Sequence, residues 1–245
     1  MSTYAIGDIH GNLGPLEDLL SQMTPELRPE DTLVFLGDYI DRGQDARGCV
    51  ERIIQLRSEA KFSVITLLGN HEQWMLRSLD DPTRHSWLVG MEAMETIGSY
   101  SKEAAVKITN AMGDLGIRLF KERVALPYEA FFDAMPPEHL SFFQELKPFH
   151  RTPDLVCAHG GILLDGELDP TDIDSYVWGP LGFPEDYVGH DPVVYGHRDN
   201  GVRGEDGRVR PCIGANQTYG IDTISHGVLT AMRFPDGTVF QSARK

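Results

Sequence analysis

Three short apolar segments in the first 70 residues each run into a glycine that is followed by an acid or an amide. Each segment is too short for a helix and is typical of a buried strand. The units recur about every thirty residues, which is the length of a strand–helix–strand unit in a parallel sheet. Such sheets gather functional groups at the carboxyl ends of their strands, so we expect Asp8, Asp38 and Asn70 at one edge. The segments are residues 4–6, 32–36 and 62–68.

The pattern changes between residues 80 and 147, where strand signals are scarce and apolar periodicity predicts helices. We expect a single domain over residues 1–245, with residues 80–147 as a helical insertion over the strand ends. Insertions at that place commonly shape the substrate pocket. Trp87 is expected to pack within this helical layer. The expected helices cover residues 88–97, 103–115 and 137–146.

Strand signals return after the insertion. Residues 154–158 and 192–195 have the pattern of strands and end in His159 and His197. Short alternating runs dominate from residue 213 onward, and the run Pro235-Asp236-Gly237 between two of them is a hairpin signal. We therefore expect the second half to form a β-rich sheet packed on the first, which gives an α/β fold.

Composition excludes several classes of partner. The formal net charge is −15, from 22 basic and 37 acidic residues, whereas a nucleic-acid polymer or an anionic membrane would require a basic face. The three cysteines form no C-x-x-C pair and predict no disulfide framework, which suits a reducing cytoplasmic location. The sequence shows neither a signal-peptide pattern nor an apolar run long enough to span a membrane. The cysteines are Cys49, Cys157 and Cys212.

Six polar residues follow the expected strands and together form a mixed set of oxygen and nitrogen ligands. Any one of the histidines taken alone is more often structural, and residues 7–12 taken alone could equally form a polar turn that caps the next helix through Asn12. The whole set is too large for one catalytic metal with an open position and suits two metals about 3.5–4 Å apart. Asp38 is the natural bridge, because it comes from the middle unit. The six residues are Asp8, His10, Asp38, Asn70, His159 and His197.

Five ordered motifs resemble the calcineurin-like metallophosphoesterases. The Asp-Arg-Gly run at residues 41–43 and Glu72 favour the phosphoprotein phosphatase (serine/threonine phosphatase) branch of bacterial type. The resemblance implies a four-layer α/β/β/α sandwich with two metals at the sheet edge. The motifs are Gly-Asp-Ile-His-Gly at 7–11, Gly-Asp-Tyr-Ile-Asp-Arg-Gly at 37–43, Gly-Asn-His-Glu at 69–72, His-Gly-Gly at 159–161 and Gly-His at 196–197.

The resemblance also implies how the metals are held. A hydroxide bridging them would attack phosphorus in line and directly. Mn is the favoured metal, with Fe and Zn as alternatives for this ligand set. The first metal would be held by Asp8, His10 and Asp38, and the second by Asp38, Asn70, His159 and His197.

Further roles of single residues follow from the same resemblance. His71 would protonate the leaving group as the general acid. Asp41 would hold His71 and raise its pKa through opposite charge. Arg42 would clamp two phosphoryl oxygens, and Asn70 would also contact the substrate phosphate. Glu72 is expected either to cap its helix or to support the ligands from behind.

One position departs from the pattern of the family. Close relatives place an arginine directly after a tryptophan in the loop that follows the His-Gly-Gly motif. Here Trp178 is followed by Gly179 and Pro180, so the second phosphate-binding arginine is missing at that place. Arg198, which follows His197, is the first candidate to substitute for it, and Arg203 is a second, weaker one.

The leading functional hypothesis is a phosphomonoesterase that acts on phosphorylated serine and threonine in proteins or on a small phosphoester. The alternative is hydrolysis of symmetric dinucleoside tetraphosphates (Ap4A), which would need basic and stacking residues in the insertion. A third hypothesis is a non-catalytic scaffold of the same fold, which the complete ligand set disfavours. Candidate residues for the alternative are Trp87, Arg84, Lys102 and Lys107.

Overall fold

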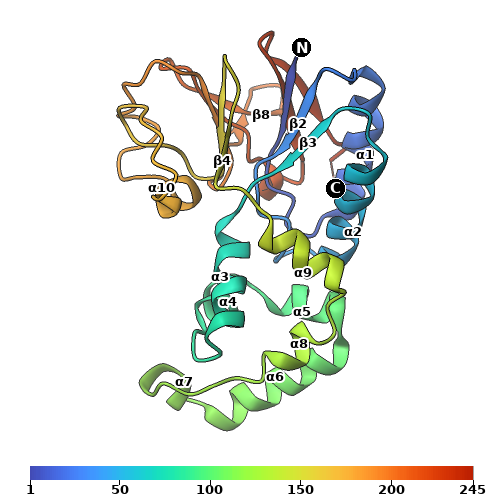
Figure 1. Ribbon diagram of the computed structural model, residues 1–245, viewed down its shortest axis with the longest axis vertical. Helices are drawn as coiled ribbons and strands as arrows, with labels where there is room; N and C mark the ends of the chain where they lie inside the picture. The colour runs from blue at the N-terminus through green and yellow to red at the C-terminus, as the bar shows by residue number, and fades with distance from the viewer. Residues whose placement is uncertain (245) are drawn as a thin grey trace.

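The structure, a computed structural model, describes residues 1–244 and contains two five-stranded sheets (Figure 1). In the first sheet β1, β2 and β3 run parallel, and β11 and β12 add an antiparallel hairpin beside β1. Ile6 pairs with Phe35, and Phe35 pairs with Thr66, so the three parallel strands end at one level. The strands are β1 (Thr3–Ile6), β2 (Thr32–Phe35), β3 (Ser63–Thr66), β11 (Thr230–Phe234) and β12 (Thr238–Gln241).

The second sheet is built from the part of the chain after the helical region. Its order is β4-β5-β6-β10-β9, with β5, β6 and β10 parallel. The strands expected over 154–158 and 192–195 form as β5 and β6, and the hairpin expected at residues 235–237 joins β11 to β12. The bounds are β4 (Phe149–Arg151), β5 (Val156–Ala158), β6 (Val193–Tyr195), β9 (Cys212–Ile213) and β10 (Thr218–Gly220), with a separate ribbon of β7 (Val202–Arg203) and β8 (Val209–Arg210).

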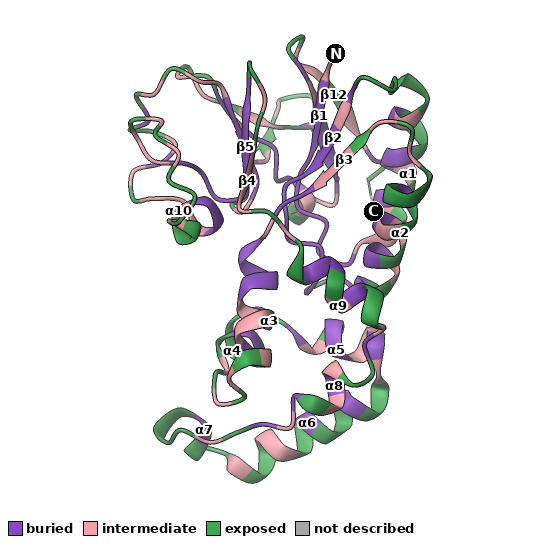
Figure 2. Ribbon diagram, in the orientation of Figure 1, coloured by how far each residue is buried: buried purple, intermediate pink, exposed green. Residues whose placement is uncertain are grey.

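The two-residue alternation of the strands sorts their side chains into layers. Ala5 and Val34 join residues of the second sheet such as Val194 in a buried cluster between the sheets. Their neighbours Tyr4 and Phe35 belong to the other face, which packs on α1 and α2. The outer face of the second sheet is covered by α10 and adjoining loops. Figure 2 shows the strands as the buried centre, with helices outside, so the order of layers is α/β/β/α.

Helices α4 to α9 lie between the two sheets in the sequence, and α3 leaves the carboxyl end of β3 to join them (Figure 1). Among residues 1–244, no helix is both long and apolar enough to cross a membrane. The helices are α1 (Leu13–Met23), α2 (Ala46–Glu59), α3 (Asn70–Asp80), α4 (Ser86–Gly90), α5 (Met94–Tyr100), α6 (Lys102–Leu115), α7 (Arg118–Lys121), α8 (Glu129–Phe132), α9 (Pro137–Gln144) and α10 (Ile173–Trp178), with 3₁₀ turns at Thr24–Glu26 and Ile224–His226.

The single helix expected over residues 88–97 is wrong, because the chain forms α4 and α5 with a break between them. Glu92 lies in this break with φ of 56°, a left-handed conformation that no α-helix contains. Apolar periodicity alone does not register such a break, since Leu88, Met91 and Ile97 are buried on both sides of it.

Candidate metal centre

The structure brings all six candidate ligands together at the carboxyl ends of the parallel strands. Each side chain follows its strand directly or, for Asn70, opens the helix after it. Five of the six residues are buried, and His197 is half-buried. The residues come from both sheets, so the centre lies where the two sheets meet. They are Asp8 and His10 after β1, Asp38 after β2, Asn70 at the start of α3, His159 after β5 and His197 after β6.

Asp38 lies at the middle of the cluster. Its Oδ2 is 3.5 Å from His10 Nε2, and its Oδ1 is 3.3 Å from His159 Nε2. Two groups of ligand atoms that lie within 4.8 Å of one another share this carboxylate, one with His10 and His71, the other with His159 and His197. Although burial alone would raise the pKa of Asp38, the surrounding imidazoles of His159, His71 and His10 hold it well below its usual value.

The rings of His10 and His159 have the orientation that is typical of metal-binding histidines. His10 Nδ1 lies 2.9 Å from the carbonyl oxygen of Ile40, and His159 Nδ1 lies 3.0 Å from that of Leu36. A ring that donates through Nδ1 carries its lone pair on Nε2, and metal-bound histidines commonly have this second contact. Both Nε2 atoms face Asp38. The donor set and its orientation therefore fit divalent metal ions.

Asn70 connects the second group of ligands. Its Oδ1 is 3.0 Å from His159 Nε2 and 2.9 Å from His197 Nδ1. The burial of His197, together with the nearby His159, lowers its pKa to about 3, which leaves the ring neutral near pH 7. A neutral imidazole and an amide oxygen are both competent ligands.

Asp8 adds a second buried carboxylate to the centre. Its carboxylate accepts the backbone N–H of His197 at 3.0 Å and lies 3.9 Å from His10 Nε2. Burial, followed by the nearby carboxylates of Asp222 and Asp38, raises the pKa of Asp8 well above its usual value. Buried carboxylates so close together require a counter-charge, and a divalent cation supplies one.

The backbone around the site is held in conformations that are rare for residues with a side chain. Left-handed φ angles of non-glycine residues are costly, and they concentrate at functional sites. Asn12 supports one of them, since its amide donates to the carbonyl oxygens of Ile9 and His10 at 2.8 and 2.7 Å; this contact replaces the expected capping of α1. The residues are His10 (46°), Asp38 (51°), Asp41 (69°), Arg42 (63°) and His197 (66°).

Gly196 lets Asp8 approach the end of β6, because a Cβ at this glycine would collide with Asp8 Oδ1. We expect Gly196→Ala to displace Asp8 and to weaken Mn²⁺ binding about tenfold or more. Isothermal titration with Mn²⁺ measures the affinity. Gly113→Ala is the matched control, since a Cβ at this helical glycine meets nothing within 4 Å. Equal Mn²⁺ affinity in both variants would contradict this role of Gly196.

His71 and Asp41 form a buried pair beside the centre. His71 Nδ1 is 2.7 Å from Asp41 Oδ2, and His71 Nε2 points toward Asp38 at 3.7 Å. Burial alone would lower the pKa of His71, but Asp38 and the hydrogen bond to Asp41 outweigh it and raise the pKa above its usual value. The arrangement can therefore keep a proton on an imidazole that faces the metal ligands.

The two candidate arginines are placed differently. Arg42 reaches over the centre, with Nη1 2.9 Å from His10 Nε2 and Nη2 3.3 Å from His71 Nε2. Arg198 lies beside His197, but its Nη1 donates to the carbonyl oxygen of Phe183 at 2.9 Å. Arg42 is therefore in direct contact with the candidate ligands, whereas Arg198 is tied to the loop after α10.

Glu72 has both of the roles that its sequence position suggested. One carboxylate oxygen accepts the N–H of Gly69 at the start of α3 and the N–H of Asp38. The other accepts the N–H groups of Tyr39 and Ile40 at 2.8 and 3.2 Å. Glu72 thus fastens the loop that carries Asp38 to the helix that carries Asn70.

Sequence reasoning missed two residues that contact Asp41. Trp87 Nε1 donates to Asp41 Oδ2 at 2.8 Å, and Thr96 Oγ1 donates to Oδ1 at 2.6 Å. Both belong to the helical insertion, 46 and 55 residues away from Asp41 in the chain. No local periodicity or spacing relates such distant positions, so only the fold reveals these contacts.

This site and fold define a metal-binding α/β/β/α protein, and comparison with known proteins identifies its family. The profile described as "Calcineurin-like phosphoesterase" matches residues 1–201. The chain belongs to the calcineurin-like phosphoesterase family. The expected fold and family resemblance are thereby confirmed, whereas the serine/threonine phosphatase branch stays a prediction.

Among curated relatives, the zinc-dependent endopolyphosphatase of Saccharomyces cerevisiae is 25% identical over 173 residues, which cover 69% of this chain and 49% of the relative. The symmetrical bis(5'-nucleosyl)-tetraphosphatase of Pectobacterium atrosepticum is 42% identical over 77 residues, covering 31% of this chain and 25% of that enzyme. The matches thus span about half of the first relative and a quarter of the second.

Two solved structures resemble the fold over nearly its whole length. A putative diadenosine tetraphosphatase has a TM-score of 0.60 at 19% identity, covering 98% of this chain and 92% of that one. A cold-active protein-tyrosine phosphatase of a psychrophilic Shewanella has a TM-score of 0.57 at 18% identity, covering 99% and 80%. At this identity the likeness shows a shared fold.

Proposed function

We propose that this protein is a two-metal phosphoesterase whose metal ions share Asp38. The observation that carries the proposal is the position of this carboxylate between two groups of imidazoles, with the His71–Asp41 pair beside them. We further propose that the chain acts as one metallophosphoesterase domain in which residues 80–147 are the insertion.

The six ligands divide as the family resemblance implies. Two bound divalent ions, in the first instance Mn²⁺, would lower the pKa of a water molecule and offset the charge of the phosphoryl group. Zinc is a competing assignment, because the yeast relative is named as zinc-dependent. One ion would bind Asp8, His10 and Asp38, and the other Asp38, Asn70, His159 and His197.

His71 donates the proton in this proposal. Asp38 and the hydrogen bond to Asp41 raise its pKa above the usual value, which favours the protonated form that a general acid needs, whereas a metal ligand must be neutral. Arg42 contacts both His10 and His71, so its guanidinium is within reach of phosphoryl oxygens at the same place. Asn70 and Arg198 are the remaining candidates for phosphate contact.

We propose that a symmetric dinucleoside tetraphosphate is the first substrate to test, ahead of the phosphoprotein favoured by the sequence. Two kinds of relative named for tetraphosphate and polyphosphate hydrolysis support this order. The insertion does not supply the expected stacking residue, because Trp87 is only 1% exposed. Trp178 and Trp74 are half-buried, with ring centroids 5.0 Å apart, and Trp178 lies 5.7 Å from the ring of His197. Such a pair beside the centre can stack on a base.

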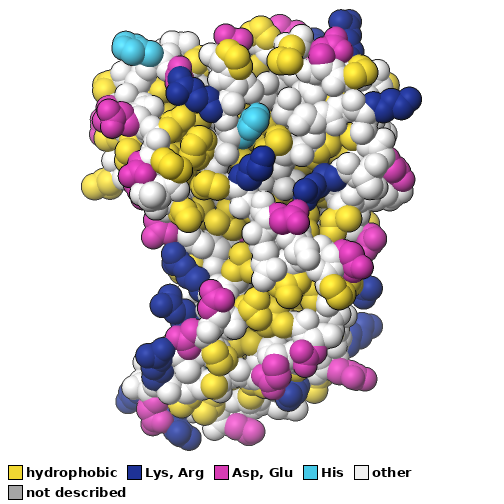
Figure 3. Space-filling view, viewed as in Figure 1, with side chains coloured by type: hydrophobic (Ala, Val, Ile, Leu, Met, Phe, Trp, Pro, Cys, Tyr) yellow, Lys and Arg dark blue, Asp and Glu magenta, His cyan; other side chains and the backbone are white. Residues whose placement is uncertain are grey.

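Two of the other insertion candidates are paired with carboxylates. Arg84 lies 3.7 Å from Asp81, and Lys107 lies 3.0 Å from Glu129. On the face seen in Figure 3, basic and acidic side chains are interspersed. Phosphate recognition therefore rests on the metals and on individual arginines at the centre, as the acidic composition already suggested.

A comparison of substrates tests the proposed function. The Mn²⁺-loaded protein is given diadenosine tetraphosphate, a phosphoserine peptide and p-nitrophenyl phosphate, with products separated by chromatography. We expect the tetraphosphate to be cleaved fastest and to yield ADP. A dominant rate on the peptide would restore the protein-phosphatase hypothesis. Absence of turnover on all three substrates, with Mn²⁺ or Zn²⁺ bound, would contradict an enzymatic role.

A further inference from the structure

The carboxylate of Asp41 is completely buried and is held by three side chains. Its Oδ2 contacts His71 Nδ1 at 2.7 Å and accepts the indole N–H of Trp87 at 2.8 Å. Its Oδ1 accepts the hydroxyl of Thr96 at 2.6 Å. The backbone N–H of Asp41 donates to the same Thr96 oxygen at 2.7 Å. Two residues of the insertion thus fix the rotamer of Asp41 and support its left-handed backbone.

Both donors are themselves rigidly placed. Trp87 packs in an aromatic cluster, with its ring 5.3 Å from Phe131 and 6.3 Å from Tyr128. Thr96 is 0% exposed. They belong to different helices, α4 and α5, and the break at Glu92 separates these helices. If α4 and α5 formed one continuous helix, positions 87 and 96 would lie along a single helix axis. Here the side chains at these positions reach opposite oxygens of one carboxylate.

We infer that Trp87 and Thr96 are positioning residues that hold Asp41 against His71, so that the helical insertion completes the proton-donating pair. This inference rests on the proposed function for its kinetic consequence. When a buried carboxylate loses a donor, either one of its oxygens lacks a hydrogen bond, which costs free energy, or the carboxylate turns away from its other partners. In both cases the imidazole of His71 is oriented less well for proton transfer.

The test uses variants that each remove one donor. Thr96→Val keeps the side-chain shape, Trp87→Phe keeps an aromatic ring but is smaller, and Thr96→Ser is the conservative variant that retains the hydroxyl. Phenyl phosphate and p-nitrophenyl phosphate are compared, because the poorer leaving group of phenyl phosphate needs the proton more. We expect kcat on phenyl phosphate to fall about tenfold in the first two variants, with a smaller loss on p-nitrophenyl phosphate, unchanged metal content and recovery in Thr96→Ser.

Phe131→Leu is the matched packing control, since Phe131 contacts the Trp87 ring. It is expected to lower thermal stability without changing the ratio of the two kcat values. In a His71→Asn background, the loss caused by Trp87→Phe should disappear, because residues acting through one group are not additive. Equal losses on both substrates, or a loss that persists without His71, would overturn the inference.

A spectroscopic measurement separates this inference from the proposed function. The downfield proton resonance of the His71–Asp41 hydrogen bond is assigned by its absence in His71→Asn. We expect this resonance to shift or broaden in Trp87→Phe and Thr96→Val and to persist in Thr96→Ser and Phe131→Leu. If the protein showed no turnover, the proposed function would be rejected, and the resonance alone would decide the inference. An unchanged resonance in all variants would overturn the inference.

Discussion

Replacing Asp38 with asparagine is expected to reduce kcat/KM about a thousandfold or more, because the charge that both proposed metal sites share is lost. Asparagine has the same shape and tolerates the left-handed φ of 51° at this position, so the fold is expected to survive. Circular dichroism checks the fold, elemental analysis counts the bound Mn²⁺, and initial rates give kcat/KM.

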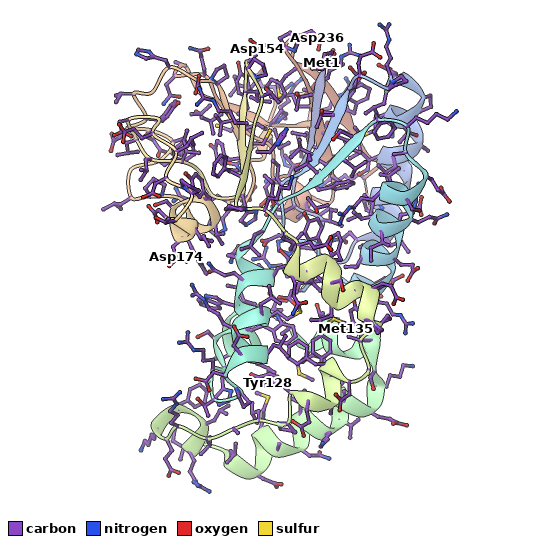
Figure 4. All side chains as sticks on the ribbon, in the orientation of Figure 1. Met1, Tyr128, Met135, Asp154, Asp174 and Asp236 are labelled. Carbon is purple, nitrogen blue, oxygen red and sulfur yellow. The ribbon has the colours of Figure 1, made fainter. Side chains whose placement is uncertain are left out.

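Asp154→Asn is the matched control for this experiment. Asp154 is exposed at the start of the β5 segment, at the end of the sandwich away from α3 (Figure 4). It is expected to leave both metal content and turnover unchanged. If Asp38→Asn retained two ions per chain and full activity, Asp38 would not be the bridge.

His71→Asn is expected to lower kcat on phenyl phosphate by about 10²–10⁴-fold, which is the usual contribution of general acid catalysis. The loss on p-nitrophenyl phosphate should be smaller, because its leaving group departs without a proton. Metal content should remain unchanged, since His71 carries a proton in this account. Steady-state kinetics on the two substrates and elemental analysis of the variant measure these quantities.

The same variant distinguishes two roles of His71 that geometry brings close together. Its Nε2 lies 3.7 Å from Asp38 Oδ2, and it belongs to one of the groups whose atoms could hold a metal. Loss of a metal ion in His71→Asn, with both substrates affected equally, would assign His71 as a ligand. Exposed His190→Asn serves as the control for a histidine outside the site.

The sequence predicted that the candidate ligands lie together because they follow a regular pattern of strands. Parallel strands of similar length end at one level, as the pairing of Ile6, Phe35 and Thr66 shows. Residues placed just after such strands must meet, so Asp8 and Asp38 could be brought together without a structure. The family motifs then completed the set with His159 and His197, which come from the second sheet.

The contacts of the insertion could not be predicted in the same way. Trp87 and Thr96 reach Asp41 only because α4 and α5 are separated by a left-handed residue, and apolar periodicity does not register this break. Arg198 could be placed next to His197, but the contact of its guanidinium with Phe183 depends on the loop after α10. Long-range polar contacts of this kind are set by tertiary packing.

The number of divalent ions bound per chain tests the central claim most directly. The protein is loaded with Mn²⁺, freed of excess metal and measured by elemental analysis together with electron paramagnetic resonance. This account predicts two ions per chain with a spin-coupled spectrum, because both ions share the carboxylate of Asp38. One ion per chain, or two ions with uncoupled spectra, would contradict a shared two-metal centre.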